Sequence, residues 1–311
     1  MSARPWSFDQ PVPSRGYRWW YVDALSEDGA HGITVIAFIG AVFSPWYAWA
    51  HRRGAADPAE HCCLNVALYG HPRRWAMTDR RAGALRREAD TLAIGPSRLH
   101  WDGTALTIDI EEVTAPLPSR LAGRVRVLPE AVSTRAFVLD AGGRHLWQPI
   151  APRSRIEVAM THPALRWSGP AYFDTNTGSA PLEEDFAAWD WCRAPLREET
   201  AILYNARRSD GSEQSLALRV RRDGGVEEFA PPPPARMART RWLLPRPTRA
   251  EGGAAQAVRT LLDAPFYARS EIRTRLLGEE AKAVHEYLDL KRFRSPLLYP
   301  MLPFRVPRAL R

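Results

Sequence analysis

Cysteine is scarce in this chain of 311 residues: only Cys62, Cys63 and Cys192 are present. The neighbours Cys62 and Cys63 do not readily bridge each other, and an odd number leaves one thiol unpaired, so a disulfide framework is excluded. Proteins that keep their thiols reduced are typical of a reducing compartment. The cysteine content therefore predicts a cytoplasmic location.

Long apolar runs are also missing. The longest, Gly32–Phe43, falls well short of the roughly 20 residues that a bilayer-spanning helix needs. The opening stretch MSARPWSFDQPVPSRGY contains no apolar core of signal-peptide length. We therefore expect neither a transmembrane helix nor export.

Lysine is nearly absent, with Lys282 and Lys291 as its only occurrences, so arginine supplies almost all of the positive charge behind the formal net charge of +8. These arginines are spread along the chain, and no nucleic-acid recognition motif accompanies them. Nucleic-acid binding is therefore not expected, and an ordinary solvated surface accounts for the charge. Weak attraction to anionic lipid stays open.

Signatures of cofactor sites and of a hydrolase nucleophile are missing too. His61, Cys62 and Cys63 resemble half of a zinc site, but no second cysteine pair or spaced histidine pair completes four ligands, so burial in a core is the better interpretation. No glycine-rich nucleotide fingerprint follows a strand, and no Gly-x-Ser-x-Gly elbow occurs. We expect neither a metal nor a nucleotide cofactor.

What the chain does contain is a series of short segments rich in Val, Ile, Trp and Tyr, separated by turn residues. YRWWYVDAL and ITVIAFIGAVF flank the turn signal SEDGAHG, Asp102-Gly103 separates two alternating runs, and Gly142-Gly143 marks a further turn. Near the C-terminus GEEAKAVHEYL would also suit a helix. SEIRTRLL and AVHEYLDL alternate around GEE, however, and this favours two strands.

This pattern predicts an all-β protein with little helix, built from sandwiches or barrels. The length suits two domains. We place their boundary near residue 130, which gives an N-terminal β-sandwich or barrel domain of residues 1–130 and a C-terminal β-barrel domain of residues 131–311 with a short tail.

Two short stretches, RHLWQ and AYFDT, each carry functional side chains at positions i and i+2: His145 with Trp147, and Tyr172 with Asp174. Alternate residues of a strand face the same way, so one strand would present an imidazole with an indole and another a phenol with a carboxylate. Such spacing alone more often belongs to half-buried strand residues. The 12 Trp likewise serve core packing by default, but they also suit an apolar cavity lined with rigid rings.

Several long segments resemble the carotenoid 1,2-hydratases, which are the hydroxyneurosporene synthases of purple photosynthetic bacteria. They are WWYVDALSEDG, FIGAVFSPWYAWA, LNVALYG, EEVTAPLPSR, AYFDTNTGSAPLEEDFAAWDW and PFYARS. The resemblance runs from about Tyr17 to Arg308 and so covers nearly the whole chain. It implies a lipocalin-related fold: two β-barrel or sandwich-like domains with an apolar passage for a polyene. It also implies an active site of a His-x-Trp pair and a Tyr-x-Asp pair, which match His145, Trp147, Tyr172 and Asp174.

The activity implied by the resemblance is addition of water to the terminal C1–C2 double bond of an acyclic carotene, such as neurosporene, lycopene or their derivatives. The product is a 1-hydroxy carotenoid, and no cofactor is required. The implied partners are the acyclic carotenoid substrate and water. Because a long polyene lives in the membrane, the protein is expected in the cytoplasm with peripheral contact to the inner photosynthetic membrane.

The chemistry suits these residues. An isolated alkene is a very weak base, so its protonation needs a well-placed acid, and burial among apolar walls would hold a carboxyl group protonated near neutral pH. Our hypothesis is that Asp174 protonates C2 and that the faces of Trp147 and Tyr172 stabilise the cation at C1. His145 would orient the captured water or accept its proton. Tyr172 could instead hold Asp174 by a hydrogen bond.

Two other functions stay open. A cyclase or pericyclase on the same lipocalin-like scaffold would use a similar apolar cavity, but it would not need the His-x-Trp and Tyr-x-Asp pairs. A lipid- or pigment-binding protein would hold the polyene without converting it.

Overall fold

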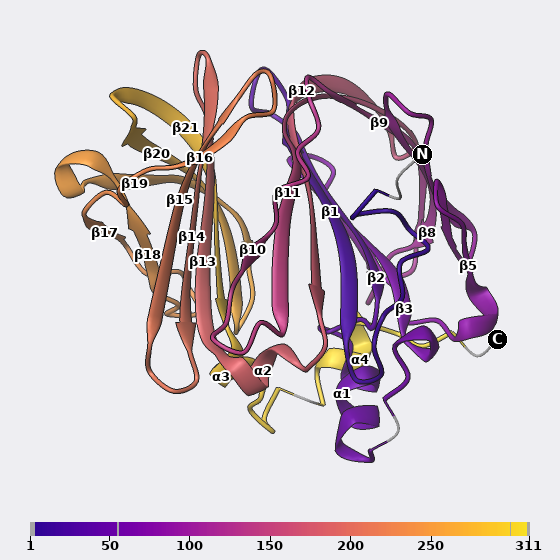
Figure 1. Cartoon of the computed structure of the whole chain (residues 1–311). Coiled ribbons are helices and arrows are strands. Elements are labelled where there is room, and N and C mark those ends of the chain that lie inside the picture. Colours follow the sequence, from indigo (N-terminus) through magenta and orange to yellow (C-terminus); the bar gives the residue numbers. More distant parts are fainter. Residues whose placement is uncertain (1–3, 55, 299, 310–311) are drawn as a thin grey trace. The chain divides into compact units, whose positions relative to one another are not determined.

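The computed structural model describes residues 4–54, 56–298 and 300–309, and it divides the chain into two compact units (Figure 1). Unit 1 comprises Met1–Pro181 together with Tyr299–Arg311, and unit 2 comprises Leu182–Leu298. Unit 2 is thus an insertion in the sequence of unit 1. The boundary expected near residue 130 falls inside unit 1, because β9 (Arg120–Pro129) is hydrogen-bonded to β11 (His145–His162).

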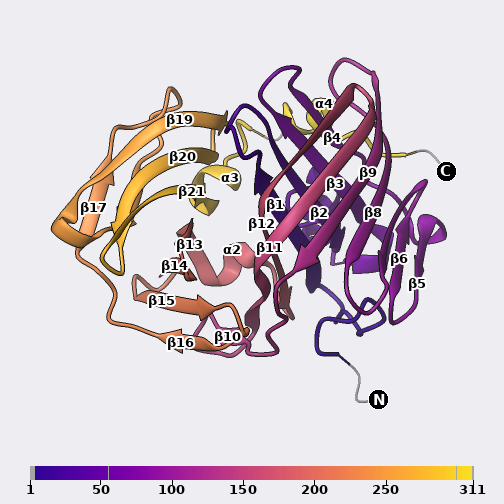
Figure 2. The ribbon, with the colours of Figure 1, turned by 90° about the horizontal axis from the view of Figure 1, so that it is seen from above.

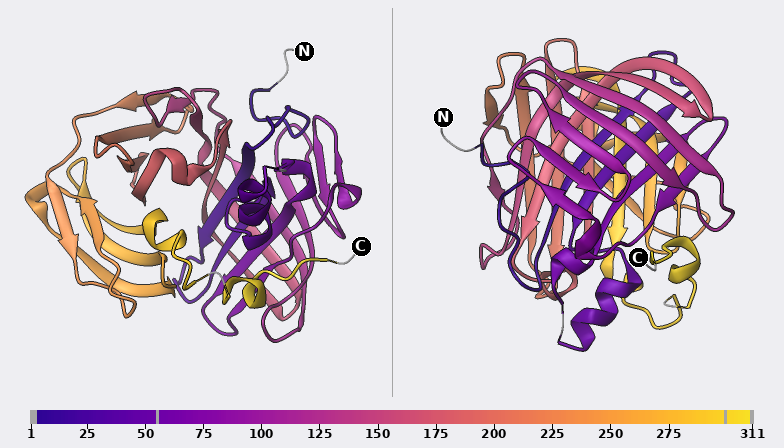
Figure 3. Two further views of the ribbon diagram at one scale, coloured as in Figure 1. Left: turned by 90° about the horizontal axis from the view of Figure 1, so that it is seen from below. Right: turned by 90° about the vertical axis from the view of Figure 1, so that its right-hand side faces the viewer.

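Unit 1 is built on one antiparallel sheet. Its strands, besides β9 and β11, are β1 (Tyr17–Leu25), β2 (Gly32–Ile39), β3 (Cys62–Tyr69), β4 (Arg74–Met77), β5 (Leu85–Arg87), β6 (Thr91–Ile94), β7 (Ser97–Trp101), β8 (Leu106–Val113), β10 (Phe137–Val138) and β12 (Ala164–Gly178). They lie in the order β4-β3-β2-β1-β12-β11-β9-β8-β7-β6-β5, with β10 paired to β11 beside this path (Figure 2). Figure 3 shows that this sheet curls strongly.

The predicted hairpins of unit 1 are confirmed. β1 pairs with β2 across the turn SEDGAH, and β7 pairs with β8 across Asp102-Gly103. The Asp102 carboxylate accepts hydrogen bonds from the backbone N–H groups of Thr104 and Ala105, both at 2.8 Å. Gly103 has φ +102°, a conformation that favours glycine. The side chain of Asp102 and the missing Cβ of Gly103 together fix this turn.

The central strand β1 has two buried faces of different character. Trp20 and Val22 point into the hydrophobic core of unit 1, with apolar residues of the neighbouring strands. Trp19, Tyr21 and Asp23 alternate with them and point to the opposite face, where they are buried as well. A buried carboxylate on the second face distinguishes it from a core, because charged groups are rarely buried without a specific reason.

Helices are few and short. α1 (Pro45–Arg52) begins at Ser44, whose hydroxyl accepts a hydrogen bond from the Trp46 backbone N–H at 3.2 Å. The others are the short helices α2 (Leu182–Asp185), α3 (Leu290–Phe293) and α4 (Leu302–Arg305) and the 3-10 turns η1 (Pro58–Glu60), η2 (Ala82–Ala84) and η3 (Glu251–Gly253). The prediction of an all-β protein with little helix is confirmed.

No helix among the described residues combines the length and the apolar character that crossing a lipid bilayer requires.

Unit 2 is built on a second antiparallel sheet. Its strands are β13 (Phe186–Pro195), β14 (Glu199–Arg208), β15 (Glu213–Arg221), β16 (Val226–Glu228), β19 (Ala255–Asp263), β20 (Tyr267–Leu276) and β21 (Glu279–Asp289), and a separate ribbon pairs β17 (Pro234–Met237) with β18 (Arg246–Arg249). The strands of the sheet lie in the order β16-β15-β14-β13-β21-β20-β19. The two strands predicted around GEE are confirmed as β20 and β21, which pair directly.

A buried carboxylate links the ribbon of unit 2 to its sheet. Asp190 on β13 accepts a hydrogen bond from the side-chain amide of Asn205 on β14 at 2.7 Å. The amide oxygen of Asn205 in turn accepts one from Arg249 on β18 at 3.0 Å. Burial raises the pKa of Asp190 to about 7, although Asn205 and Arg249 both oppose that shift.

The pKa of Asp190 predicts a pH-dependent stability. An unfolded aspartate releases its proton near pH 4, whereas the folded protein holds that of Asp190 up to about pH 7. Between these values the folded state binds more protons, so the free energy of unfolding should fall as the pH rises, by roughly 1 kcal/mol per pH unit. Asp190→Asn is expected to remove this slope, as measured by urea unfolding at several pH values. The exposed Asp223→Asn serves as the control, and an unchanged slope in Asp190→Asn would refute the assignment.

Candidate active site

Three of the four candidate residues meet around one carboxylate oxygen. The Trp147 indole N–H and the Tyr172 hydroxyl both donate to Asp174 Oδ2, each at 2.8 Å. Trp147 lies on β11, and the other two lie on β12. The Trp147 and Tyr172 side chains are fully buried, and Asp174 is 5% exposed. The i, i+2 spacing of Tyr172 and Asp174 therefore places both on one face, as the sequence predicted.

An irregular stretch of β11 begins immediately beyond Trp147. The register against β12 shifts between Pro149 and Ala151, and again between Ala151 and Ser154. Proline has no backbone N–H to give to the ladder, and bulges of this kind bend a strand and re-aim its side chains. Trp147 pairs with Asn176, and Asp174 pairs with Pro149, so the indole reaches the carboxylate along a diagonal.

The electrostatics of the cluster keep Tyr172 in its donor form. Burial raises the pKa of Tyr172 well above its usual value, and the negative charge of Asp174 raises it further. The phenol therefore stays protonated at any physiological pH. Two donors that converge on Oδ2 orient the carboxyl group of Asp174.

His145 lies apart from this cluster. It pairs with Gly178, four residues along β12 from Asp174, which corresponds to ~13 Å along the strand. Its Nδ1 lies 2.9 Å from the Tyr17 hydroxyl, within hydrogen-bonding distance, and its ring stacks on that of Tyr17. Gly178 must be glycine here, because a Cβ would meet the Tyr17 ring at 2.4 Å and the His145 ring at 2.7 Å.

Strand β1 adds residues that the sequence analysis did not single out. Asp23 pairs directly with Tyr172 and Tyr21 with Asp174, so their side chains share the face of the cluster. Asp23 is fully buried, and its charge contributes to the raised pKa of Tyr172. YRWWYVD shows the same alternation as the other two strands. Its partner strand β12, however, lies about 150 residues further along the chain, so the sequence did not indicate that the two meet.

Aromatic rings surround the polar groups. Tyr17 stacks on Trp19 at 4.8 Å, Tyr21 meets Tyr172 edge to face at 6.1 Å, and Phe137 lies 5.7 Å from Trp147, measured between ring centroids. Such rings are rigid and apolar, and their faces attract cations. The site therefore combines one oriented carboxyl group, a second carboxyl group and several surrounding aromatic rings.

The described residues contain no group of three or more His, Cys, Asp or Glu side chains close enough to hold a metal ion. His61 hydrogen-bonds to Asp79 at 3.3 Å, which gives it a structural partner. Burial raises the pKa of the Cys62 thiol to about 12 and that of Cys63 well above its usual value. Both cysteines thus remain thiols inside unit 1, which agrees with their interpretation as core residues.

Comparison with known proteins bears on this site. An acyclic carotenoid 1,2-hydratase of Thiocapsa roseopersicina is 56% identical over 310 residues, covering 99% of this chain and 76% of that protein. One of Rubrivivax gelatinosus is 49% identical, covering 97% of this chain and 75% of that protein. One of Cereibacter sphaeroides is 49% identical, covering 88% of this chain and 98% of that protein.

Solved structures share the fold at low sequence identity. A protein of Nitrosomonas europaea assigned as AttH superposes with a TM-score of 0.61 and 15% identity, covering 92% of this chain and 95% of that one. CghA with Sch210972 superposes with a TM-score of 0.54 and 11% identity, covering 93% and 96%. These likenesses confirm the lipocalin-like fold class and carry no argument about chemistry.

The sequence model of one family, described as carotenoid hydratase CrtC, matches residues 35–311. That match spans most of the chain, and the relatives named above are far more than 30% identical to it. The chain therefore belongs to the carotenoid hydratase CrtC family.

Proposed function

We propose that this protein is an acyclic carotenoid 1,2-hydratase that adds water across the terminal C1–C2 double bond of neurosporene, lycopene or their derivatives. The observation that carries the proposal is the buried carboxyl group of Asp174, held at one oxygen by Trp147 and Tyr172. The relatives that bear this name support the substrate class.

The first step is protonation of C2 by Asp174. The proton leaves the Asp174 carboxyl group, the two electrons of the π bond form the new C–H bond, and the positive charge falls on C1, the more substituted carbon. Rings of Trp147, Tyr172 and Tyr21 lie around the carboxyl group and stabilise the cation by cation–π attraction, worth about 2 kcal/mol when water is excluded. No ring atom acts as a nucleophile that would trap the cation.

Water then attacks C1, and a base removes one of its protons. Asp23 lies diagonally across the strand pair from Asp174, which places their Cα atoms about 7–8 Å apart. His145 lies about 13 Å along the strand, too far to serve water at the carbon next to the protonated one. We assign the base to Asp23 and the orientation of the polyene and water supply to His145 with Tyr17.

One proton must move from Asp23 back to Asp174 before the next turnover. After the reaction Asp23 is protonated and Asp174 is ionised. Tyr172 donates to Asp174 and lies opposite Asp23, so its hydroxyl can pass a proton from one to the other. The sum of the steps is carotene plus water giving the tertiary alcohol, and nothing else is consumed.

The test of the proposed function is conversion in cells that accumulate lycopene or neurosporene, with pigments analysed by chromatography and mass. A product heavier by one water supports the hydratase. A well-folded protein that converts none of these carotenes would overturn the substrate class and favour a cyclase or a pigment carrier on the same fold.

Replacing each candidate base separates the roles of Asp23 and His145. Asp23→Asn is expected to lower turnover about a hundredfold or more, the range of a lost general base. His145→Gln is expected to raise KM more than it lowers kcat, because orientation and not proton transfer is lost. Purified variants would be assayed on detergent-dispersed lycopene. If His145→Gln instead lowers kcat about a hundredfold and Asp23→Asn mainly raises KM, the general base is His145 and not Asp23.

A further inference from the structure

The most exposed large apolar side chains of unit 1 gather around Trp75. Leu117 is 82% exposed, Phe304 73%, Met301 53% and Val113 52%. The loop that carries Leu117 is tied to β4, because the Ala115 backbone N–H donates to the Trp75 carbonyl at 3.2 Å. On the other side the Arg305 guanidinium lies over the Trp75 ring at 4.5 Å. We call Trp75, Val113, Leu117, Met301, Phe304 and Arg305 the Trp75 corner.

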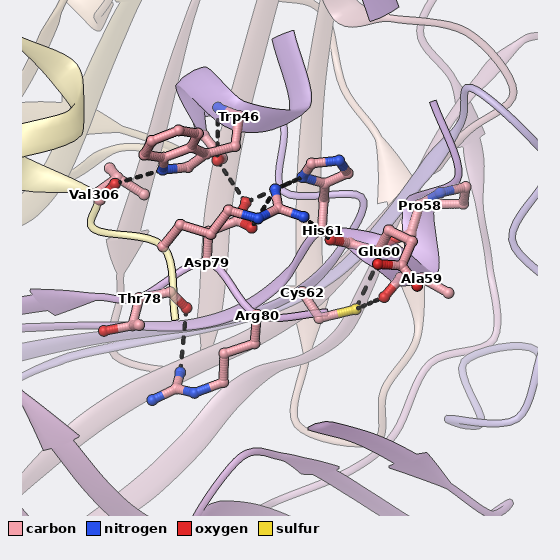
Figure 4. Close-up of polar contacts among 12 residues, drawn as sticks. Trp46, Pro58, Ala59, Glu60, His61, Cys62, Thr78, Asp79, Arg80 and Val306 are labelled. Atoms are coloured by element: carbon pink, nitrogen blue, oxygen red, sulfur yellow. Dashed lines mark hydrogen bonds and ion pairs between the residues drawn. The ribbon is translucent and has the colours of Figure 1, made fainter. Parts of the chain in front are cut away.

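A buried clamp fixes the chain that follows Phe304 (Figure 4). The Asp79 carboxylate is fully buried, pairs with Arg308 at 3.1 Å and accepts a hydrogen bond from Ser44. The Trp46 indole N–H donates to the Val306 carbonyl at 2.9 Å. The backbone of Asp79 also bonds to Pro307 and Ala309, at 2.9 and 2.8 Å. These contacts hold the backbone that follows Phe304 in place, and so they keep the exposed Phe304 side chain at the surface.

The charges around the corner are positive. Arg73 and Arg74 precede Trp75, Arg305 stacks on it, and Arg52 and Arg53 end α1, which lies beside α4 (Figure 1). Of the acids that precede Val113 on β8, Glu111 is paired with Arg120 at 2.8 Å, and Glu112 is buried and paired with Arg80 at 2.7 Å. Exposed apolar side chains surrounded by arginines suit the surface of an anionic bilayer. The apolar side chains insert between the lipids, and the arginines bind the phosphate groups.

We propose that the Trp75 corner seats the protein on an anionic membrane surface. This inference rests on the proposed function, because a hydratase of acyclic carotenes must collect a substrate that is dissolved in lipid. Isolated exposed apolar residues are common on soluble proteins, but four on adjoining elements with a cationic rim form a patch of the kind used for docking. We propose no membrane contact for any other surface of the protein.

Sedimentation with lipid vesicles tests the proposal. Wild-type protein is expected to bind phosphatidylglycerol vesicles, to bind phosphatidylcholine vesicles weakly, and to be released by salt. The double variant Leu117→Glu/Phe304→Glu should bind phosphatidylglycerol about tenfold more weakly or worse. The matched control is Val132→Glu/Val258→Glu, which adds the same charge at exposed valines outside the corner, 40% and 49% exposed; it should bind like wild type.

Activity in detergent separates this proposal from the proposed function. Leu117→Glu/Phe304→Glu should convert detergent-dispersed lycopene at the wild-type rate and lose conversion only when lycopene is supplied in vesicles. Equal vesicle binding by the two double variants would overturn the docking surface, as would a wild type that ignores phosphatidylglycerol. Concentration-dependent dimerisation that only the corner variant abolishes would assign the patch to a second copy instead. Failure of wild type to convert lycopene even in detergent would refute the function and leave the vesicle result standing.

Discussion

Replacing Asp174 with asparagine is expected to lower the turnover of an acyclic carotene about a thousandfold, which is within the range for loss of a general acid. The amide has nearly the shape of the carboxyl group. Trp147 and Tyr172 can still donate to its oxygen, so the two hydrogen bonds of 2.8 Å are kept. What disappears is the proton that must reach C2. The measurement is the rate of hydroxylated product from detergent-dispersed lycopene with purified enzyme.

Two further readouts decide what that loss means. Quenching of Trp fluorescence by the polyene should be unchanged in Asp174→Asn, because binding does not need the proton. Asp109→Asn on β8 is the matched control, since its carboxylate is partly exposed and pairs with Arg124. Normal turnover in Asp174→Asn would discard Asp174 as the acid while the hydratase stands. A parallel loss of binding would reduce Asp174 to a structural residue.

Much of the site could be predicted from local spacing. A strand has a period of two, so Tyr172 and Asp174 had to share a face, and the same held for His145 and Trp147. Which residues then meet depends on register, and register depends on pairing between distant strands. The bulges at Pro149 and Ala151 shift β11 against β12, and no local sequence pattern predicts these bulges. The family resemblance, and not the spacing, grouped His145 with Asp174, and the pairing of β11 with β12 places His145 four residues along the sheet from it.

Non-local pairing also explains the residues and the boundary that were missed. Asp23 joins the site because β1 pairs with β12, far along the chain. Composition near residue 130 changes little, and the structure runs one sheet through that point before unit 2 begins at Leu182. The aromatic segment around Trp46, unlike the strands around it, forms a helix that begins at Pro45. Hairpins, by contrast, were predictable because their signals are contiguous.

Replacing Arg80 with methionine is expected to lower the free energy of unfolding by about 3–5 kcal/mol, the cost of stranding a buried charge. Arg80 donates to Glu112 Oε2 at 2.7 Å, while Ser97 donates to Oε1 at 3.3 Å. Glu112 is only 2% exposed, so water cannot replace the lost guanidinium. Methionine keeps an unbranched apolar stem and removes the charge. Urea unfolding of both proteins measures the difference.

The pH dependence of that loss identifies its cause. Burial already raises the pKa of Glu112 despite the opposing effect of Arg80, and removal of Arg80 should raise it further. A folded-state pKa above the unfolded value makes the folded state bind more protons, so stability declines as the pH rises. Arg80→Met should therefore be most damaging at alkaline pH and least at acidic pH.

Arg80→Met/Glu112→Leu should recover much of the stability, because no charge is left unpaired. The exposed pair is the control: Arg120→Met removes the partner of Glu111 at 2.8 Å, where water screens the charge, and it should change stability little. A loss in Arg80→Met that is independent of pH and not recovered in the double variant would place the cost in packing around Gly95, which the Arg80 side chain contacts closely, and not in the buried charge.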